Sequence, residues 1–553
     1  MAVDGGLLRC DGHLFKQMAE AGLAWLEANQ ERVNQLNVFP VPDGDTGTNM
    51  FLTMRKAYDE ITDLDEPHIG KVSQKLSYGA RLGARGNSGV ILSEWLRGFA
   101  EALEDQAAFD SVLFAQACQR AVERSYKSVV SPVEGTILTV SRQAMEAVIE
   151  RAKVEHDINV LFETKVQAAY ESLRHTPDLL PMLKEAGVVD SGGQGWTFII
   201  EGMLRSLRGE ETRFSGAQAV AAQKTGWQDA LVPEDEQGYG YDVQFLMRGE
   251  GLDVDSVRKA IADIGWSALV VGDPRLIKVH VHVHDPGVPI SYAIQQGAAI
   301  DDVVVENMQQ QYQSYVAHRE ARENQPPKVV EGVAVIAVTS GEGISRMFTD
   351  ELGAASVVVG GQTMNPSIET FLNAIKALPN DEIILLPNNP NVIMAARQVV
   401  SLAEGKTVRV VPSRTIPQGV VAMFEYSNEH ESGDIDAIAE AMTAALANVI
   451  TIEVTTATRT TTLNGIYVRE SQLIGLIDDQ MAAAGDAFQP LLKTLLEKAG
   501  ADKRELITLY YGDVITGAEA QTLSDQLAGD FAAQEFQIVN GGQPLYPYIV
   551  SIE

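Results

Sequence analysis

The spacing of apolar residues changes along this chain, and that change decides what the chain can fold into. From the N-terminus to about residue 207, apolar residues recur at helical spacing, and runs of β-branched residues are few. The spacing predicts helices over 13–36, 46–61, 69–84, 89–104, 111–127, 135–150, 157–174 and 195–207. Such amphipathic helices must bury their apolar faces against one another, so we expect an all-α N-terminal domain.

Beyond this region the sequence predicts mixed helix and strand. Tyr241–Arg248 alternates apolar and polar residues, and Leu276–Val283 is a second predicted strand, which together indicate a small α+β domain. From residue 332, short apolar strands alternate with helices, which predicts βαβ units with a parallel sheet, followed by a second α/β half. The expected division is a helical domain 1–208, a linker 209–237, a middle domain 238–318, a linker 319–331 and a C-terminal domain 332–553.

The segment Asn37–Asn49 places two carboxylates, two prolines and two glycines in one turn before a helix. Pro40 and Pro42 stiffen this turn because each fixes its own φ angle. Crowded carboxylates repel one another unless a hard cation lies between them, and oxygen ligands suit Mg²⁺. The free N–H groups at the start of the following helix favour an anion. This combination predicts a nucleoside triphosphate site that performs phosphoryl transfer, although Asp-Gly-Asp alone also suits an ordinary turn.

Three further glycine-rich loops precede predicted helices. They are Gly83–Gly89, Pro132–Thr136 and Asp190–Gly195. Glycine lets a backbone approach a ligand closely, and a helix start offers N–H donors to phosphate. In the first of these loops Ser88 adds a hydroxyl and Arg85 a positive charge. Each loop taken alone is an ordinary helix start, but all four can gather at one end of a helical barrel.

Charge and cysteine content exclude several classes of protein. The 43 Lys and Arg residues against 75 Asp and Glu residues give a net charge of −32, which repels nucleic acid and anionic lipid. The two cysteines, Cys10 and Cys118, provide neither a disulfide framework nor a cysteine-rich zinc site. No transmembrane segment or secretory signal is predicted, so we expect a cytoplasmic protein.

Alternating histidines are the clearest signal in the middle domain. His280, His282 and His284 follow one another at every second position, so a strand would place them on one face. Neutral imidazoles at that spacing can share a zinc ion if another strand supplies ligands. A solvent-facing row of histidines is the alternative.

Several motifs together resemble a known family. Asn37–Asn49, Gly83–Gly89 and Gly187–Gly195 closely resemble the ATP-binding domain of dihydroxyacetone kinases (DhaL or Dak2 type). The resemblance is closest to the ATP-binding subunit of bacterial fatty acid kinase. Further matches lie at 360–367, 386–389, 415–419 and 541–548, so the resemblance covers essentially the whole chain. It implies an N-terminal eight-helix barrel, a small α+β middle domain and a C-terminal α/β domain similar to the fatty-acid-binding (DegV-like) fold.

The resemblance also implies roles for particular residues. ATP would be held through two Mg²⁺ ions by Asp43 and Asp45, the predicted catalytic residues, with Asn37 at a third metal position where dihydroxyacetone kinases have an aspartate. Ser88 and Gly89 match the turn that grips phosphate, and Thr136 falls in the loop near the adenine. The nucleotide-binding residues predicted here are Thr46, Thr48, Asn49, Gly86, Asn87, Ser88, Gly89, Gly135, Thr136, Asp190 and Gly192. Related chains bind zinc with His280, His282 and a cysteine, and Asp242 stands where that cysteine is expected.

The expected reaction is phosphorylation of a fatty acid that a separate DegV-like protein presents, which gives an acyl phosphate for phospholipid synthesis. The C-terminal domain is expected to dock that partner, and a homodimer through the middle or C-terminal domain is also expected. Residues 360–367 follow a strand and open a helix, which suits either a ligand or partner site or a purely structural turn. Two other functions stay open: a dihydroxyacetone-type kinase with a separate substrate subunit, and a non-catalytic scaffold that binds nucleotide or metal.

Overall fold

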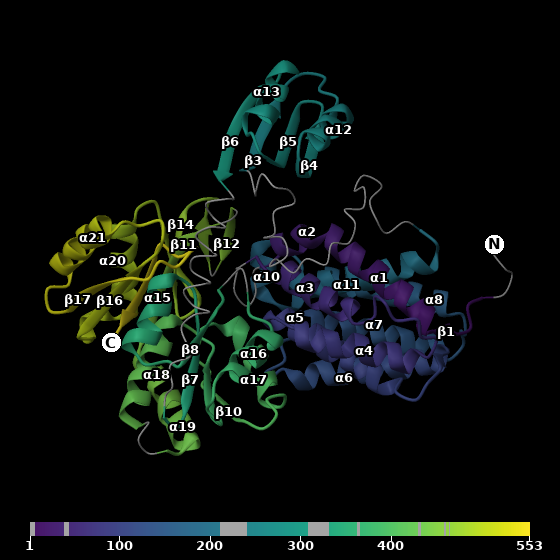
Figure 1. Cartoon of the computed structure of the whole chain (residues 1–553), viewed down its shortest axis with the longest axis horizontal. Helices are drawn as coiled ribbons and strands as arrows, with labels where there is room; N and C mark the ends of the chain where they lie inside the picture. Colours follow the sequence, from purple (N-terminus) through teal and green to yellow (C-terminus); the bar gives the residue numbers. More distant parts are fainter. Residues whose placement is uncertain are drawn as a thin grey trace. The chain divides into compact units, whose positions relative to one another are not determined.

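The structure is a computed structural model that describes residues 6–37, 44–210, 241–307, 331–361, 365–429, 433–457, 460–463 and 465–553. It divides into two compact units, of which one joins Met1–Ser215 to Pro327–Glu553 and the other is Gly216–Pro326. The helical and C-terminal domains form the first unit, and the middle domain lies in the second (Figure 1). An N-terminal helical region, a middle domain and a C-terminal α/β domain are thereby confirmed. The two predicted linkers fall almost entirely outside the described residues.

Helices make up nearly all of the described N-terminal domain. The predicted helix 13–36 is in fact two helices that meet at Asn29, and the last helix begins at Ser191 rather than at residue 195. Side-chain caps fix several helix starts, since Asp110, Thr136 and Asp190 each accept a hydrogen bond from a backbone N–H of the first turn. The helices are α1 (Gly12–Ala28), α2 (Gln30–Gln35), α3 (Thr46–Asp59), α4 (Ile69–Gly83), α5 (Gly86–Ala102), α6 (Ser111–Ser128), α7 (Ile137–Ala152), α8 (Ile158–Arg174), α9 (Thr176–Leu179), α10 (Pro181–Ala186) and α11 (Ser191–Leu207). A two-stranded pair, β1 (Cys10–Asp11) and β2 (Ala108–Phe109), completes the domain.

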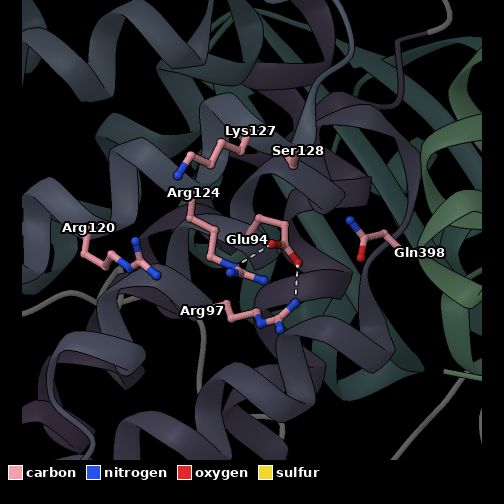
Figure 2. Close-up of a pocket in the computed structure, with 7 residues that line it drawn as sticks. All are labelled: Glu94, Arg97, Arg120, Arg124, Lys127, Ser128 and Gln398. Carbon is pink, nitrogen blue, oxygen red and sulfur yellow. Dashed lines mark hydrogen bonds and ion pairs between the residues drawn. The ribbon is translucent and has the colours of Figure 1, made fainter. Parts of the chain in front are cut away.

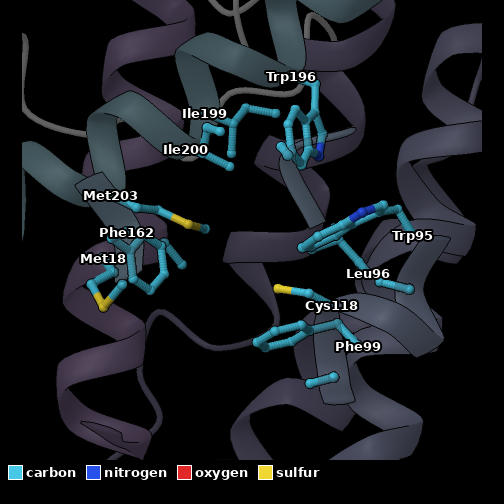
Figure 3. Packing of buried hydrophobic residues seen from close by; sticks show 14 of the residues in the cluster. Met18, Trp95, Leu96, Phe99, Cys118, Phe162, Trp196, Ile199, Ile200 and Met203 are labelled. Carbon is cyan, nitrogen blue, oxygen red and sulfur yellow. The ribbon is translucent and has the colours of Figure 1, made fainter. Parts of the chain in front are cut away.

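Aromatic side chains fill the core of this domain (Figure 3). Trp95 stacks on Phe99 with ring centroids 5.5 Å apart, and Trp196 meets Trp95 edge-on at 5.7 Å. Phe114 stacks on Phe162 at 4.7 Å. Such ring pairs add attraction beyond the burial of their surface. The helices are therefore held by a continuous packed interior.

The middle domain is a four-stranded antiparallel sheet with two helices. The strand order is β4-β5-β3-β6. Val243 and Phe245 of the sheet pack with Ile261 of a helix, which buries one face as the alternation predicted. Its elements are β3 (Tyr241–Arg248), α12 (Val254–Ile264), β4 (Trp266–Asp273), β5 (Leu276–Val283), α13 (Gly287–Gln295) and β6 (Ala299–Asn307). An α+β fold is thus observed for this domain.

The first half of the C-terminal domain contains the predicted parallel sheet. Its order is β10-β9-β7-β8, and every pair in it is parallel. All residues of the central strand β7 are buried, as expected for a sheet covered on both faces. The elements are β7 (Ala334–Thr339), α15 (Glu342–Arg346), β8 (Ser356–Val359), α16 (Ile368–Ala377), β9 (Glu382–Leu386), α17 (Pro390–Val400), β10 (Thr407–Val410), α18 (Ile416–Glu429) and α19 (Ile435–Ala445).

The second half is a six-stranded sheet in the order β15-β14-β11-β18-β16-β17. Only its β16–β17 pair is parallel. The elements are β11 (Ile450–Thr456), β12 (Thr461–Leu463), β13 (Ile466–Val468), β14 (Leu473–Ile477), β15 (Gln480–Gly485), α20 (Phe488–Ala499), β16 (Leu506–Tyr511), α21 (Gly517–Asp530), β17 (Glu535–Asn540) and β18 (Tyr548–Ile552), where β12 and β13 form a separate pair. None of the helices in the described part of the chain has the length and apolarity that crossing a bilayer would require.

Within the first unit, the C-terminal domain packs directly on the helical domain. Ala84 and Val90, which flank the start of α5, belong to the same buried cluster as Ile368 of α16. The backbone N–H of Ile368 donates to the carbonyl of Ala84 at 3.2 Å, and Lys56 forms an ion pair with Glu369 at 3.1 Å. The start of α16, which follows β8, therefore lies beside the start of α5 and the last turn of α3.

Candidate functional site

Asp45 immediately precedes the first residue of α3. The helix begins at Thr46, and the Asp45 carboxylate does not cap it. Asp45 is only 4% exposed, so its carboxylate lies in a partly dehydrated pocket at a helix N-terminus. Residues 38–43 are outside the described residues, so the position of Asp43 stays a prediction.

A buried polar cluster surrounds this helix start. The Thr46 hydroxyl donates to Asn37 Oδ1 at 2.6 Å, which brings the two ends of the 37–49 loop together. Ser191 Oγ, at the start of α11, lies 3.3 Å from both Asn37 Oδ1 and Thr46 Oγ1. Ser191 was not among the predicted residues, although its place between Asp190 and Gly192 in a glycine loop is a signal that could have identified it.

The starts of α3, α5, α7 and α11 meet at one end of the helical domain. Gly86 at the start of α5 has φ of 60°, and a Cβ there would lie 2.5 Å from Asn49 Nδ2 in the first turn of α3. The Asp190 carboxylate, which precedes α11, accepts a hydrogen bond from the backbone of Ile137, the first residue of α7. Four helix N-termini thus converge, and their N–H groups and dipoles favour an anion. This is the arrangement expected from the four glycine loops.

Other predicted residues have structural partners. Thr48 Oγ1 accepts from Gln30 at 2.9 Å and from Asn34 at 3.1 Å, so it ties α2 to α3. A Cβ at Gly89 would lie 2.4 Å from Thr53 Oγ1, so this glycine permits close packing of α5 on α3. Thr136 caps α7, and Gly135, with φ of 84°, forms the turn before it. Ser88 lies in the first turn of α5 and is half-buried.

Residues from the C-terminal domain also reach this end of the helical domain. Asn365 Nδ2 donates to Asp45 Oδ2 at 2.5 Å, and Asn87 Nδ2 donates to Asn391 Oδ1 at 2.9 Å. Asn365 lies in the 360–367 loop that the sequence identified, and Ser367 of that loop caps α16. The loop therefore has a structural role at Ser367, where it caps α16. It also contacts the candidate site through Asn365. The pairing of Asn365 with Asp45 had no signal in the sequence.

The described oxygen atoms near Asp45 suit a hard cation. They come from a carboxylate, two amides and hydroxyl groups, and Asn365 Oδ1 is buried without a hydrogen-bond partner in the described part of the chain. Oxygen donors of this kind are those that Mg²⁺ prefers. Among the described residues, no group of three or more His, Cys, Asp or Glu side chains could hold a metal ion. A cation bound here would need further oxygen ligands from Asp43, from the amides or from a nucleotide to complete its coordination shell.

Asp190 has an unusual environment. Its Oδ2 accepts from the backbone N–H of Gly193 at 2.7 Å, and its own N–H donates to Thr176. Burial raises the pKa of this carboxyl from its ordinary 3.8 to about 6, against the lowering effect of its backbone hydrogen bonds. The folded state therefore binds this proton more tightly than the unfolded state. The stabilisation from this group is complete below about pH 4 and is lost as the pH rises through about 6.

We expect Asp190→Asn to stabilise the protein at pH 7.5 but not at pH 4. Asparagine keeps the N-cap and removes the buried charge. A pKa rise from 3.8 to about 6 corresponds to about 3 kcal/mol at most. Thermal unfolding of both proteins at the two pH values measures this difference, with Asp110→Asn at the exposed cap of α6 as the control. Equal stabilisation at both pH values would show that the carboxyl titrates normally.

The predicted zinc ligands can be placed only by their backbones. Asp242 of β3 pairs with His282 of β5 in the antiparallel register, and Gln244 pairs with His280. The side chains of Asp242, His280 and His282 are outside the described residues. The zinc site therefore stays a prediction.

A cavity of about 240 Å³ lies between α5, α6 and α17 (Figure 2). Arg97, Arg120, Arg124 and Lys127 line it, but Glu94 is buried among them and pairs with Arg124 at 2.9 Å and with Arg97 at 3.5 Å. Glu101 also pairs with Arg97, Arg120 and Arg124, so much of the positive charge around the cavity is neutralised locally. The described residues that line the cavity include none of the predicted metal or nucleotide ligands.

Sequence models of three domain families match the chain. They are the DAK2 domain at residues 40–205, the middle domain of FakA-like fatty acid kinase proteins at 238–315 and the C-terminal domain of the same proteins at 334–553. Protein YloV of Bacillus subtilis is 37% identical over 98% of this chain and 99% of its own length. An uncharacterized protein of Staphylococcus aureus (strain MRSA252) is 36% identical over 99% of this chain and 100% of its own length.

Solved structures show weaker similarity. A DegV family protein from Corynebacterium glutamicum covers 40% of this chain and 96% of its own, with 13% identity and a TM-score of 0.31. The dihydroxyacetone kinase of C. freundii covers 54% of each chain, with 14% identity and a TM-score of 0.30.

Proposed function

Because the chain belongs to the FakA-like fatty acid kinase family, we propose that it is the ATP-binding subunit of a fatty acid kinase. The observation that best supports this function is that four helix N-termini meet at one end of the helical domain, where the buried Asp45 precedes α3. Helix starts bind phosphate oxygens, and a carboxylate beside them can hold a cation that bridges those oxygens. We propose that the helical domain is the DhaL-like barrel and the C-terminal domain the DegV-like part of the molecule.

In the proposed reaction, a carboxylate oxygen of the fatty acid attacks the γ-phosphorus of ATP. The bond to the bridging oxygen breaks, ADP leaves, and an acyl phosphate forms. A fatty acid is ionised at neutral pH, so no proton has to be removed from it. Mg²⁺, when bound by Asp43, Asp45 and Asn37, would neutralise the β- and γ-phosphate oxygens. The residues of this chain position the triphosphate, with the N–H groups of α3 and α5 as donors to it.

We propose that the fatty acid is presented by a separate DegV-like protein that docks on the C-terminal domain. The parallel sheet supports this placement, because the loop after β8 and the first turn of α17, which follows β9, contact the predicted nucleotide site at the carboxyl edge of the sheet. In parallel sheets this edge is where ligands commonly bind. The acceptor would then approach ATP from the side of the C-terminal domain.

The function is tested by ATP consumption with the full chain, Mg²⁺ and oleate, in the presence and absence of a DegV-like fatty-acid-binding protein. We expect ADP release that requires both oleate and the binding protein. Dihydroxyacetone with a dihydroxyacetone-binding subunit is the competing acceptor. ADP release with dihydroxyacetone and none with oleate would replace the proposal with a triose kinase.

A further inference from the structure

Asn365 combines three features that a purely structural asparagine does not need together. Its side chain is 1% exposed, it contacts the Asp45 carboxylate through Nδ2, and its Oδ1 is buried with no hydrogen-bond partner among the described residues. Leaving a buried amide oxygen unpaired is unfavourable, because the oxygen loses its hydrogen bonds to water and gains none in return. An unpaired amide oxygen beside a candidate metal site points to a missing partner for that oxygen.

The surroundings of the Asn365 side chain identify the chemistry of that partner. The carboxylate of Asp45 lies within hydrogen-bond distance, and a Cβ at Gly86 would lie 3.5 Å from Asn365 Nδ2. The unpaired oxygen is thus within a few ångströms of both the predicted metal carboxylate and the start of α5. An amide oxygen beside a carboxylate repels a second anion but is a common ligand of hard cations. Rotation of the amide about its last side-chain bond, a soft torsion, can exchange Nδ2 and Oδ1.

We propose that Asn365 Oδ1 is a ligand of the divalent cation that Asp45 holds with the nucleotide. This inference rests on the proposed function, because it needs a Mg²⁺–nucleotide complex at Asp45. It adds a residue of the C-terminal domain to a site that is otherwise built by the helical domain. Nucleotide binding would then also tie the two domains together at Asn365, since the ion would contact both.

The test is binding of Mn²⁺, as a paramagnetic substitute for Mg²⁺, to the full chain in the presence of ADP, followed by electron paramagnetic resonance. We expect Asn365→Ala to weaken Mn²⁺ binding about tenfold or more, as loss of a metal-supporting group commonly does. Asn365→Asp keeps an oxygen at this position and should bind Mn²⁺ at least as tightly as the unaltered chain. Glu369→Gln, which removes the inter-domain ion pair with Lys56, should change Mn²⁺ binding less than about twofold.

The aspartate variant separates a ligand from a simple hydrogen-bond donor. If Asn365 only donates to Asp45, an aspartate there places two carboxylates in contact, and binding should be weaker than in Asn365→Ala. That result, or equal loss in Asn365→Ala and Glu369→Gln, would overturn the inference.

If the unaltered chain binds Mn²⁺ with ADP and Asn365→Ala binds it equally well, the inference fails and the proposed function stands. If the unaltered chain binds no Mn²⁺ with ADP, the proposed function itself fails. Thermal unfolding without ion or nucleotide shows whether each variant is folded.

Discussion

Asp45→Ala is expected to reduce fatty-acid-dependent ATP turnover by at least about 1,000-fold, which corresponds to about 4 kcal/mol of transition-state stabilisation. The Asp45 carboxylate is 4% exposed and stands at the start of α3, where a cation bridging the β- and γ-phosphates would lie. Without it, charge that develops on the transferred phosphoryl group lacks its main counter-ion. Asp43→Ala is expected to have a similar effect. Turnover is measured as ADP release with oleate and the binding protein present.

Asp63→Ala is the matched control for this experiment. Asp63 is an exposed aspartate beyond the far end of α3, so its loss removes one carboxylate from the helical domain without touching the site. Its turnover should stay within about twofold of the unaltered chain. Retained turnover in both Asp43→Ala and Asp45→Ala would refute the metal assignment, provided that the circular dichroism and thermal unfolding of both variants match the parent.

Gly202→Val is expected to destabilise the helical domain by at least about 3 kcal/mol, toward the upper end of overpacking effects. Gly202 lies where α11 crosses α1, and a Cβ there would be 2.5 Å from the carbonyl oxygen of Ala21 and 2.8 Å from Cα of Gly22. These atoms are backbone, so they can move only if the two helices separate. Separation would also displace the start of α11, where Ser191 contacts Asn37. Urea unfolding followed by circular dichroism measures the loss.

Gly529→Val is the control for the difference in helix propensity between glycine and valine. Gly529 also lies in a helix, α21, but apart from its chain neighbours and the backbone of its own helix, no atom of the described residues lies within 4 Å of where its Cβ would be. Valine and glycine differ by only a few tenths of a kcal/mol in helix propensity, so this variant should be nearly neutral. Equal effects of the two substitutions would mean that the α1–α11 crossing is not tightly packed.

Local sequence patterns predicted much of the helical domain but not the details of its ends. Helix α11 begins at Ser191, earlier than the expected residue 195. The local sequence did not indicate this first turn, because Gly192, Gly193 and Gly195 are poor helix formers. The cap from Asp190 and the packing of α11 on α1 outweigh that local preference. The hairpin β14–β15 had no clear signal, since the second strand is rich in alanine. Its turn uses Asp478 and Asp479 at φ of 46° and 67°, a conformation that aspartate tolerates better than most residues.

Features that depend on contacts distant in sequence could not be predicted. Lys165 resembles an ordinary helix-surface lysine in the sequence, yet it is 2% exposed. Its Nζ lies 4.6 Å from the ring centroid of Trp95, and burial lowers its pKa. Likewise, the glycine loops indicated that several helix starts could gather at one end of the domain, but the contact of Asn365 with Asp45 joins residues 320 positions apart. Only the tertiary structure brings such groups together.

The proposed function requires the triphosphate and its cation to bind beside Asp45. A crystal structure of the full chain with Mg²⁺ and a non-hydrolysable ATP analogue tests it most directly. We predict that the β- and γ-phosphates lie at the starts of α3 and α5, with Mg²⁺ about 2.0–2.1 Å from an oxygen of Asp45. A nucleotide bound elsewhere, with Asp45 in contact with neither ion nor phosphate, would contradict the account.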